Sequence, residues 1–331
     1  MERFALAAAV VLGFALTAAL CSLFVPLRRV LERREQQQQP VQSEQPRPAP
    51  LRAPLWGGLC AAAGTVAAVG VGWLAACVGQ PELLGSEGRL MTRLLTALAG
   101  SLAFGAVGLA EDLARMRSPA ALGLRRDVRL LLEALAAAFI LLLLRAAGCL
   151  PLGLGVPGAG YVLLGSAVPF LWAVLMVALA ECARIAERDE GTVCGAAFVA
   201  MLALMMAEAG LGVPGLAVLP AALAGALVAL LLWAFPPARL GVGCCGSLLA
   251  AGAIGCIPLS LDMTSLTVPL ALPFWAAGGL LAAQLLGAKR TGKPLRCWVK
   301  KHKMSPETVF LCSFALSAVG YVLALALLRW C

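Results

Sequence analysis

The feature that most constrains the fold of this chain is a series of long, uninterrupted apolar runs. Phe4–Pro26, Leu130–Leu144 and Leu216–Phe235 are three of them. Crossing the hydrocarbon core of a bilayer takes about 20 residues of helix, and only helices or closed barrels satisfy their backbone groups there. Ala and Leu dominate the runs, and both favour helix. The pattern predicts an all-α integral membrane protein.

Composition excludes a soluble domain, because 61% of the 331 residues are hydrophobic and only 13% are charged. The first run is too long for a signal peptide, so we expect it to stay as a span. Residues 1–331 are predicted to form a single polytopic domain. We predict about ten spans, at residues 4–26, 55–78, 90–110, 130–147, 161–183, 193–211, 213–235, 247–261, 267–288 and 308–328.

The positive charges predict the orientation. Ten spans place alternate loops on one side, at residues 27–54, 111–129, 184–192, 236–246 and 289–307. These loops hold all of the 26 Lys and Arg residues except Arg3, Arg89, Arg93, Arg145 and Arg329. Because basic loops stay in the cytoplasm, both termini are expected outside. The first of these loops, residues 27–54, is rich in Gln and Pro and is predicted to be flexible.

Several classes of function are not indicated by the sequence. The twelve cysteines form no CxxC pair and there is one His, so a zinc site is not expected. The net charge of +9 is explained by topology, and nothing indicates nucleic-acid binding. A transporter is a weak alternative, because no internal repeat is evident and the acids cluster at one membrane face.

Acids at the predicted cytoplasmic edge are the first functional candidates, since ionisable groups in or beside spans are costly. Glu111 and Asp112 end the third predicted span, and Glu187, Asp189 and Glu190 follow the fifth. Adjacent carboxylates can share Mg²⁺ with substrate phosphates. The basic stretch KRTGKPLRCWVKKHK, before the last span, could hold a diphosphate. Taken singly, each acid is better explained as a solvated helix end with an ordinary topology-setting charge.

Short segments along nearly the whole chain resemble one family of membrane enzymes, in the same order. FGAVGLAEDLARM resembles FGxxGFxDDxxK, ECARIAERDEGTVCG resembles NAVNLTDGLDGLAAG, and GCCGSLLAAGAIG resembles GDxGSLALGGALG. Four shorter segments add to this. APLWGGL resembles TPTMGG, LGLRRDVRLLLE resembles GLSARQKLLLQ, KRTGK resembles KxTGK, and SPETV resembles WPETxV. The chain thus resembles a divergent member of the phospho-N-acetylmuramoyl-pentapeptide-transferase family, in the polyprenyl-phosphate glycosyl-1-phosphate transferase superfamily.

The resemblance implies a fold, a reaction and a location. It implies ten spans in a bacterial inner membrane, with outward termini and a cytoplasmic active site. The family transfers phospho-MurNAc-pentapeptide from UDP to undecaprenyl phosphate, giving lipid I and UMP in peptidoglycan synthesis. The implied cofactor is Mg²⁺, and the implied partners are a UDP-linked muramoyl peptide and a polyprenyl phosphate lipid. A homodimer is one assembly that the resemblance allows.

The resemblance also implies roles for individual residues. Asp112 and Glu111 would be the catalytic acids and the Mg²⁺ ligands, with Cys244 at the position of the family's metal-binding Asp. Gly57 and Gly58, at the start of the second span, are expected to allow close helix packing. The implied substrate-binding residues are Glu187 and Glu190 on the nucleotide side, Lys293 and His302 near the diphosphate or base, and Arg125, Arg126 and Arg129 near the lipid phosphate.

Departures from the family pattern leave two alternatives open. Cys244 replaces an Asp, and a thiol is a poor ligand for Mg²⁺. The triple-His segment is reduced to His302, Lys303 and Met304. One alternative is therefore a catalytically degenerate member that binds a UDP-sugar or polyprenyl phosphate, or that partners envelope enzymes. The other is a sister activity that transfers GlcNAc-1-phosphate to the same lipid.

Overall fold

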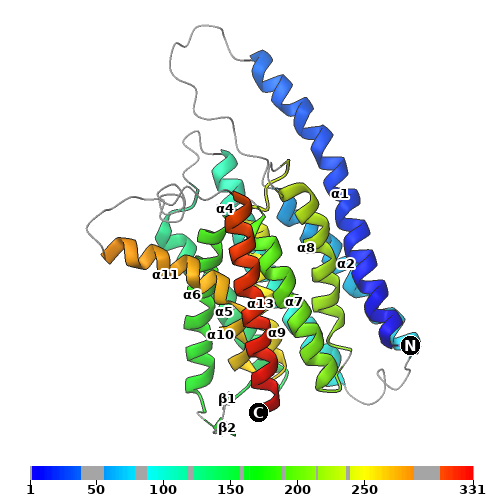
Figure 1. Ribbon diagram of the computed structural model, residues 1–331, viewed down its shortest axis with the longest axis vertical. Coiled ribbons are helices and arrows are strands. Elements are labelled where there is room, and N and C mark those ends of the chain that lie inside the picture. The colour runs from blue at the N-terminus through cyan, green and yellow to red at the C-terminus, as the bar shows by residue number, and fades with distance from the viewer. Residues whose placement is uncertain are drawn as a thin grey trace.

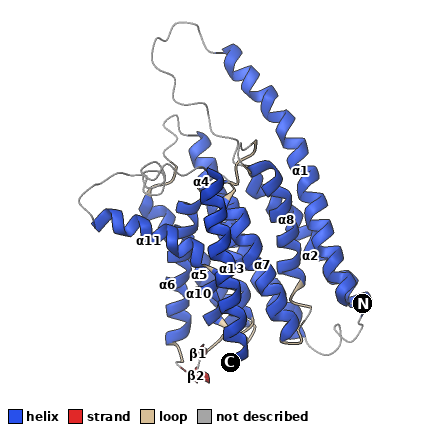
Figure 2. Ribbon diagram, in the orientation of Figure 1, coloured by secondary structure: helices blue, strands red, loops and turns tan. Residues whose placement is uncertain are grey.

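The structure, a computed structural model, describes residues 2–38, 56–79, 88–117, 123–156, 160–163, 165–187, 191–213, 215–235, 239–286 and 306–330. Almost all of this is helix, and the one strand pair in the described part is shown in red in Figure 2. The long helices are α1 (Glu2–Gln38), α2 (Gly57–Gly79), α4 (Gly88–Arg117), α5 (Arg126–Ala146), α6 (Ala167–Ala186), α7 (Thr192–Gly210), α8 (Val218–Ala234), α9 (Gly243–Ser260), α11 (Leu272–Leu286) and α13 (Pro306–Trp330).

The predicted class, an all-α integral membrane protein, is confirmed. Each predicted span overlaps one of these ten helices of the described chain. Seven of the helices are long and apolar enough to cross a membrane, and α8 is a shorter apolar helix. Both chain ends lie at the same end of the bundle in Figure 1, as an even number of crossings requires. The number of crossings and the side that faces the cytoplasm stay predictions.

Several helix boundaries differ from the prediction. Helix α1 continues to Gln38, so the start of the predicted flexible loop 27–54 is helical, while residues 39–55 lie outside the described part. Helix α4 continues to Arg117, so Glu111 and Asp112 lie within a helix and not at its end. Polar residues extend both helices beyond the apolar runs, and hydropathy alone does not detect such extensions.

Two elements were not predicted. Strands β1 (Gly153–Val156) and β2 (Gly160–Leu163) form an antiparallel hairpin where the fifth span was expected to begin. The predicted ninth span is divided into α10 (Thr267–Leu270) and α11, and a short 3-10 helix, η1 (Thr264–Leu266), precedes it. The break lies at Ala271, and α11 begins at Leu272 with Pro273 in its first turn, where a missing N–H costs no helical hydrogen bond. Beyond the break, α11 runs sideways from the bundle (Figure 1).

Helix α9 is the centre of the bundle, because all of its residues are buried. Its most extensive packing partner is α4. Small residues permit this approach: a β-carbon at Gly108 of α4 would overlap the backbone carbonyl of Cys244. The start of α2 also joins α9, since Gly57 donates its N–H to Gly241 O (3.2 Å) and Gly58 donates to Val242 O (2.9 Å). Close packing at Gly57 and Gly58 is therefore confirmed.

Candidate active site

Asp112 connects α4 to the first turn of α9. Its Oδ1 accepts the backbone N–H of Cys244 at 3.0 Å, and its Oδ2 accepts that of Cys245 at 2.9 Å. Gly243 precedes them with a φ of 72°, a left-handed conformation that glycine adopts without strain. The first N–H groups of a helix lack partners within the helix and favour a negative charge. The buried carboxylate of Asp112 meets both needs.

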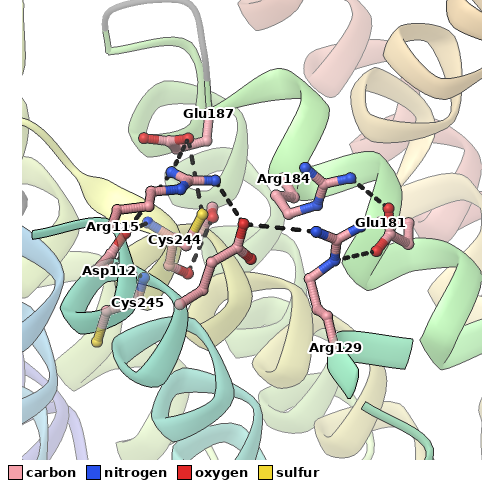
Figure 3. A network of polar contacts seen from close by, with 10 residues as sticks. Asp112, Arg115, Arg129, Glu181, Arg184, Glu187, Cys244 and Cys245 are labelled. Atoms are coloured by element: carbon pink, nitrogen blue, oxygen red, sulfur yellow. Dashed lines mark hydrogen bonds and ion pairs between the residues drawn. The ribbon is translucent and has the colours of Figure 1, made fainter. Parts of the chain in front are cut away.

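Arg115, one turn after Asp112, brings three acids together (Figure 3). Its guanidinium lies 2.6 Å from Glu111 Oε1, 3.8 Å from Asp112 Oδ1 and 3.9 Å from Glu187 Oε2. Glu187 comes from the end of α6, so the cluster joins α4 to α6. The Arg115 side chain is 22% exposed, whereas Glu111 and Asp112 are almost fully buried. Part of the Arg115 side chain is therefore exposed at the surface of the protein.

A second set of charges lies beside the first (Figure 3). Arg129 of α5 donates from Nε to Glu181 Oε1 at 2.7 Å and lies 3.6 Å from Glu111 Oε1. Glu181 also accepts from Arg184, 2.5 Å away on the next turn of α6. Arg129 is thus buried and paired with two acids of the protein, and its expected role near the lipid phosphate stays a prediction. The side chains of Arg125 and Arg126 are exposed.

Cys244 faces the acids. Its buried thiol donates toward Glu187 Oε2 over 4.0 Å, a long contact even for sulfur. The structure therefore brings four of the predicted site residues to one place, namely Glu111, Asp112, Glu187 and Cys244. Glu190, Lys293 and His302 lie outside the described residues, and so does Asp189.

The sequence analysis missed the partnership of Glu181 with Arg129 and Arg184. A signal was present, because Glu181 and Arg184 are ionisable residues three apart near the end of an apolar helix, and such residues share a face. Two further acids, Glu133 and Glu208, are buried at 0% and 1% exposure, so neither side chain reaches the membrane surface. Both oxygens of Glu133 lack a hydrogen-bond partner within the described part of the chain.

The described residues do not fit a Mg²⁺ site in this arrangement. The three carboxylates of the cluster converge on Arg115, and both oxygens of Asp112 already accept backbone N–H groups. Glu111 Oε2 is buried without a partner among the described residues, but one oxygen does not make a site for an ion that needs near-octahedral oxygen ligands. In the described ranges, no three His, Cys, Asp or Glu side chains are grouped to hold a metal.

A comparison with known protein families matches the part of the chain that holds this cluster. Residues 94–262, about half of the chain, match the sequence model of glycosyl transferase family 4. All of the charged residues of the two sets lie within the match.

Two curated relatives carry the name phospho-N-acetylmuramoyl-pentapeptide-transferase. The protein from Synechococcus sp. (strain RCC307) is 30% identical over 212 residues, which cover 63% of this chain and 55% of that protein. The protein from Geobacillus kaustophilus (strain HTA426) is 25% identical over 296 residues, which cover 88% of this chain and 86% of that protein. The chain therefore belongs to glycosyl transferase family 4, the polyprenyl-phosphate sugar-1-phosphate transferases, as a divergent relative of the phospho-N-acetylmuramoyl-pentapeptide-transferases.

Proposed function

We propose that this protein transfers phospho-MurNAc-pentapeptide from UDP to undecaprenyl phosphate, giving lipid I and UMP at the cytoplasmic face of a bacterial inner membrane. The names of both relatives support the donor. The observation that carries the proposal is the convergence of Glu111, Asp112 and Glu187 on Arg115, beside the start of α9. Helix α4, the end of α6 and the start of α9 are distant in sequence, and they meet at the segments that resemble the family motifs.

The proposed reaction is a phosphoryl transfer between two polyanions. An oxygen of the lipid phosphate attacks the sugar-bearing phosphorus of the donor, a new P–O bond forms, and the bond to the leaving UMP breaks. Catalysis of such a step is mostly positioning and stabilisation of charge. The partly exposed Arg115 is suited to phosphate oxygens, because guanidinium binds them through paired N–H groups.

Asp112 is the proposed main catalytic carboxylate of the site, since it contacts both α9 and Arg115. Through these contacts it fixes the guanidinium against the helix start. Glu111 holds Arg115 from the other side at 2.6 Å. Glu187, together with Glu190, is proposed to face the nucleotide, and Lys293 and His302 to approach the diphosphate.

A second candidate function is binding of the same ligands without catalysis of the transfer. Cys244 favours it, because a buried thiol stands beside Glu187 where the family carries a carboxylate. Such a protein would still bind UDP-sugar or polyprenyl phosphate.

The test is UMP release by the purified full chain in nanodiscs with undecaprenyl phosphate. UDP-MurNAc-pentapeptide and UDP-GlcNAc are supplied in separate reactions, each with Mg²⁺ and each with EDTA. Asp112→Asn is the variant, and Asp262→Asn is the matched control, because it makes the same change just beyond the far end of α9. We expect release from the muramoyl donor that Asp112→Asn lowers at least 100-fold and Asp262→Asn leaves within twofold. Retained binding of UDP-sugar without release from either donor would favour the second candidate.

A further inference from the structure

The cation at the centre of the acid cluster is a side chain of the protein. Arg115 lies within 4 Å of Glu111, Asp112 and Glu187. In phosphoryl transferases, acids in such a cluster commonly hold a divalent cation that neutralises the phosphates. Here a single guanidinium, which extends from the same helix as two of the acids, already contacts all three of them.

The surroundings of Arg115 oppose a second cation. Arg129 lies 3.6 Å from the same Glu111 oxygen that Arg115 contacts, so this carboxylate is shared by two positive charges. A divalent ion placed among the three acids would have to displace Arg115 or lie against it. Like charges at such a distance in a partly buried site repel strongly.

Cys244 removes a further oxygen ligand from the same place. Its backbone N–H donates a hydrogen bond to Asp112, so its side chain is held at the first turn of α9, beside Glu187. The hard cation Mg²⁺ prefers carboxylate and water oxygen over a thiol. Loss of the acid at Cys244 and the central position of Arg115 therefore have the same effect on the cluster, since both lower its affinity for a metal.

The geometry points to a site in which the Arg115 guanidinium takes the place of a divalent cation, so that the protein binds its anionic ligand without a metal. The inference rests on the proposed function only for the nature of that ligand. Whether the acids hold a guanidinium or a metal ion depends only on Arg115, Cys244 and the three acids. Metal binding by the protein can therefore be measured without donor or lipid substrate.

The experiment measures binding of Mn²⁺, the probe ion, by the decrease of its free-ion signal in electron paramagnetic resonance. The full chain is stripped with EDTA and placed in zwitterionic nanodiscs, which do not bind the ion strongly. Three proteins are compared: wild type, the double variant Arg115→Gln/Cys244→Asp, and the control Arg117→Gln/Cys244→Asp. Arg117 is an exposed arginine two residues further along α4, so the control removes the same charge and keeps Arg115.

We expect one Mn²⁺ bound by Arg115→Gln/Cys244→Asp, at least tenfold more tightly than by wild type or by the control. Saturable binding of one Mn²⁺ to wild type, lost in Asp112→Asn, would overturn the inference. Equal binding by the control and by Arg115→Gln/Cys244→Asp would overturn it as well, as would no binding by the latter when gel filtration shows it monodisperse. None of these outcomes depends on UMP release, so failure here is distinct from failure of the proposed function.

Discussion

Asp112 accepts the backbone N–H of Cys244 at 3.0 Å, and this hydrogen bond lies within the most extensively packed helix pair of the bundle, α4 and α9. The same carboxylate lies 3.8 Å from Arg115. Asp112 is therefore a structural residue as well as a candidate catalytic one. Loss of activity in an Asp112 variant has to be separated from loss of the helix contact.

Asp112→Asn is expected to destabilise the protein. Asn offers one acceptor oxygen where Asp offers two, and its amide would face the N–H of Cys244 or Cys245. Leaving one buried donor without a partner costs about 1–3 kcal/mol. The measurement is SDS titration of the purified protein, followed by circular dichroism. Asp127→Asn, on the exposed first turn of α5, is the control and should change stability by less than about 0.5 kcal/mol. Equal stabilities of the two variants would show that the α9 contact contributes little.

Gly108→Ala is expected to separate α4 from α9. The added β-carbon would overlap the carbonyl of Cys244, which is backbone and cannot rotate away. Overpacking of this kind costs about 1–3 kcal/mol. The same titration measures it, with Gly70→Ala in α2 as the control, because a β-carbon there meets nothing within 4 Å. Gly70→Ala should be neutral or stabilising by up to about 1 kcal/mol. Unchanged stability of Gly108→Ala would contradict the close approach.

Arg129 and Glu181 are expected to be energetically coupled across α5 and α6. Their 2.7 Å hydrogen bond is partly buried, and removing one partner leaves a charge without compensation. A double-mutant cycle with Arg129→Gln, Glu181→Gln and the pair should give a coupling of about 0.5–3 kcal/mol. Arg184 also binds Glu181, so part of the charge is compensated in the Arg129 variant. Additive losses in the cycle would mean that the two side chains act independently.

The sequence was sufficient for the helices because each span is encoded by local hydropathy. It failed at residues 161–163, which were taken as the start of a span but lie in strand β2. A short apolar run fits helix and strand equally, and here Gly and β-branched residues decide for the strand.

The grouping of Glu111, Asp112, Glu187 and Cys244 was predicted from motif resemblance, and the structure brings them together. The pairing of Arg129 with Glu181 was not, because these residues are 52 positions apart and meet only through the packing of α5 on α6. The central position of Arg115 was missed for a related reason. The sequence shows that an arginine follows the two acids by one turn, but not that Glu187 closes the cluster from another helix.

The orientation of the bundle is predicted by its basic loops and can be tested with topology reporters. Alkaline phosphatase fused after Cys331 should be active in a Gram-negative host, because an outward C-terminus carries the enzyme to the periplasm, where it folds. Green fluorescent protein fused there should be dark, because it is exported unfolded and does not mature outside the cytoplasm. Fusions that end in the α8–α9 connection, after Arg239, should give the reverse result, since this connection lies at the end of the bundle that holds the acid cluster. A fluorescent C-terminal fusion would invert the assignment, and the charged cluster would then face away from the cytoplasm, where no UDP-linked donor reaches it.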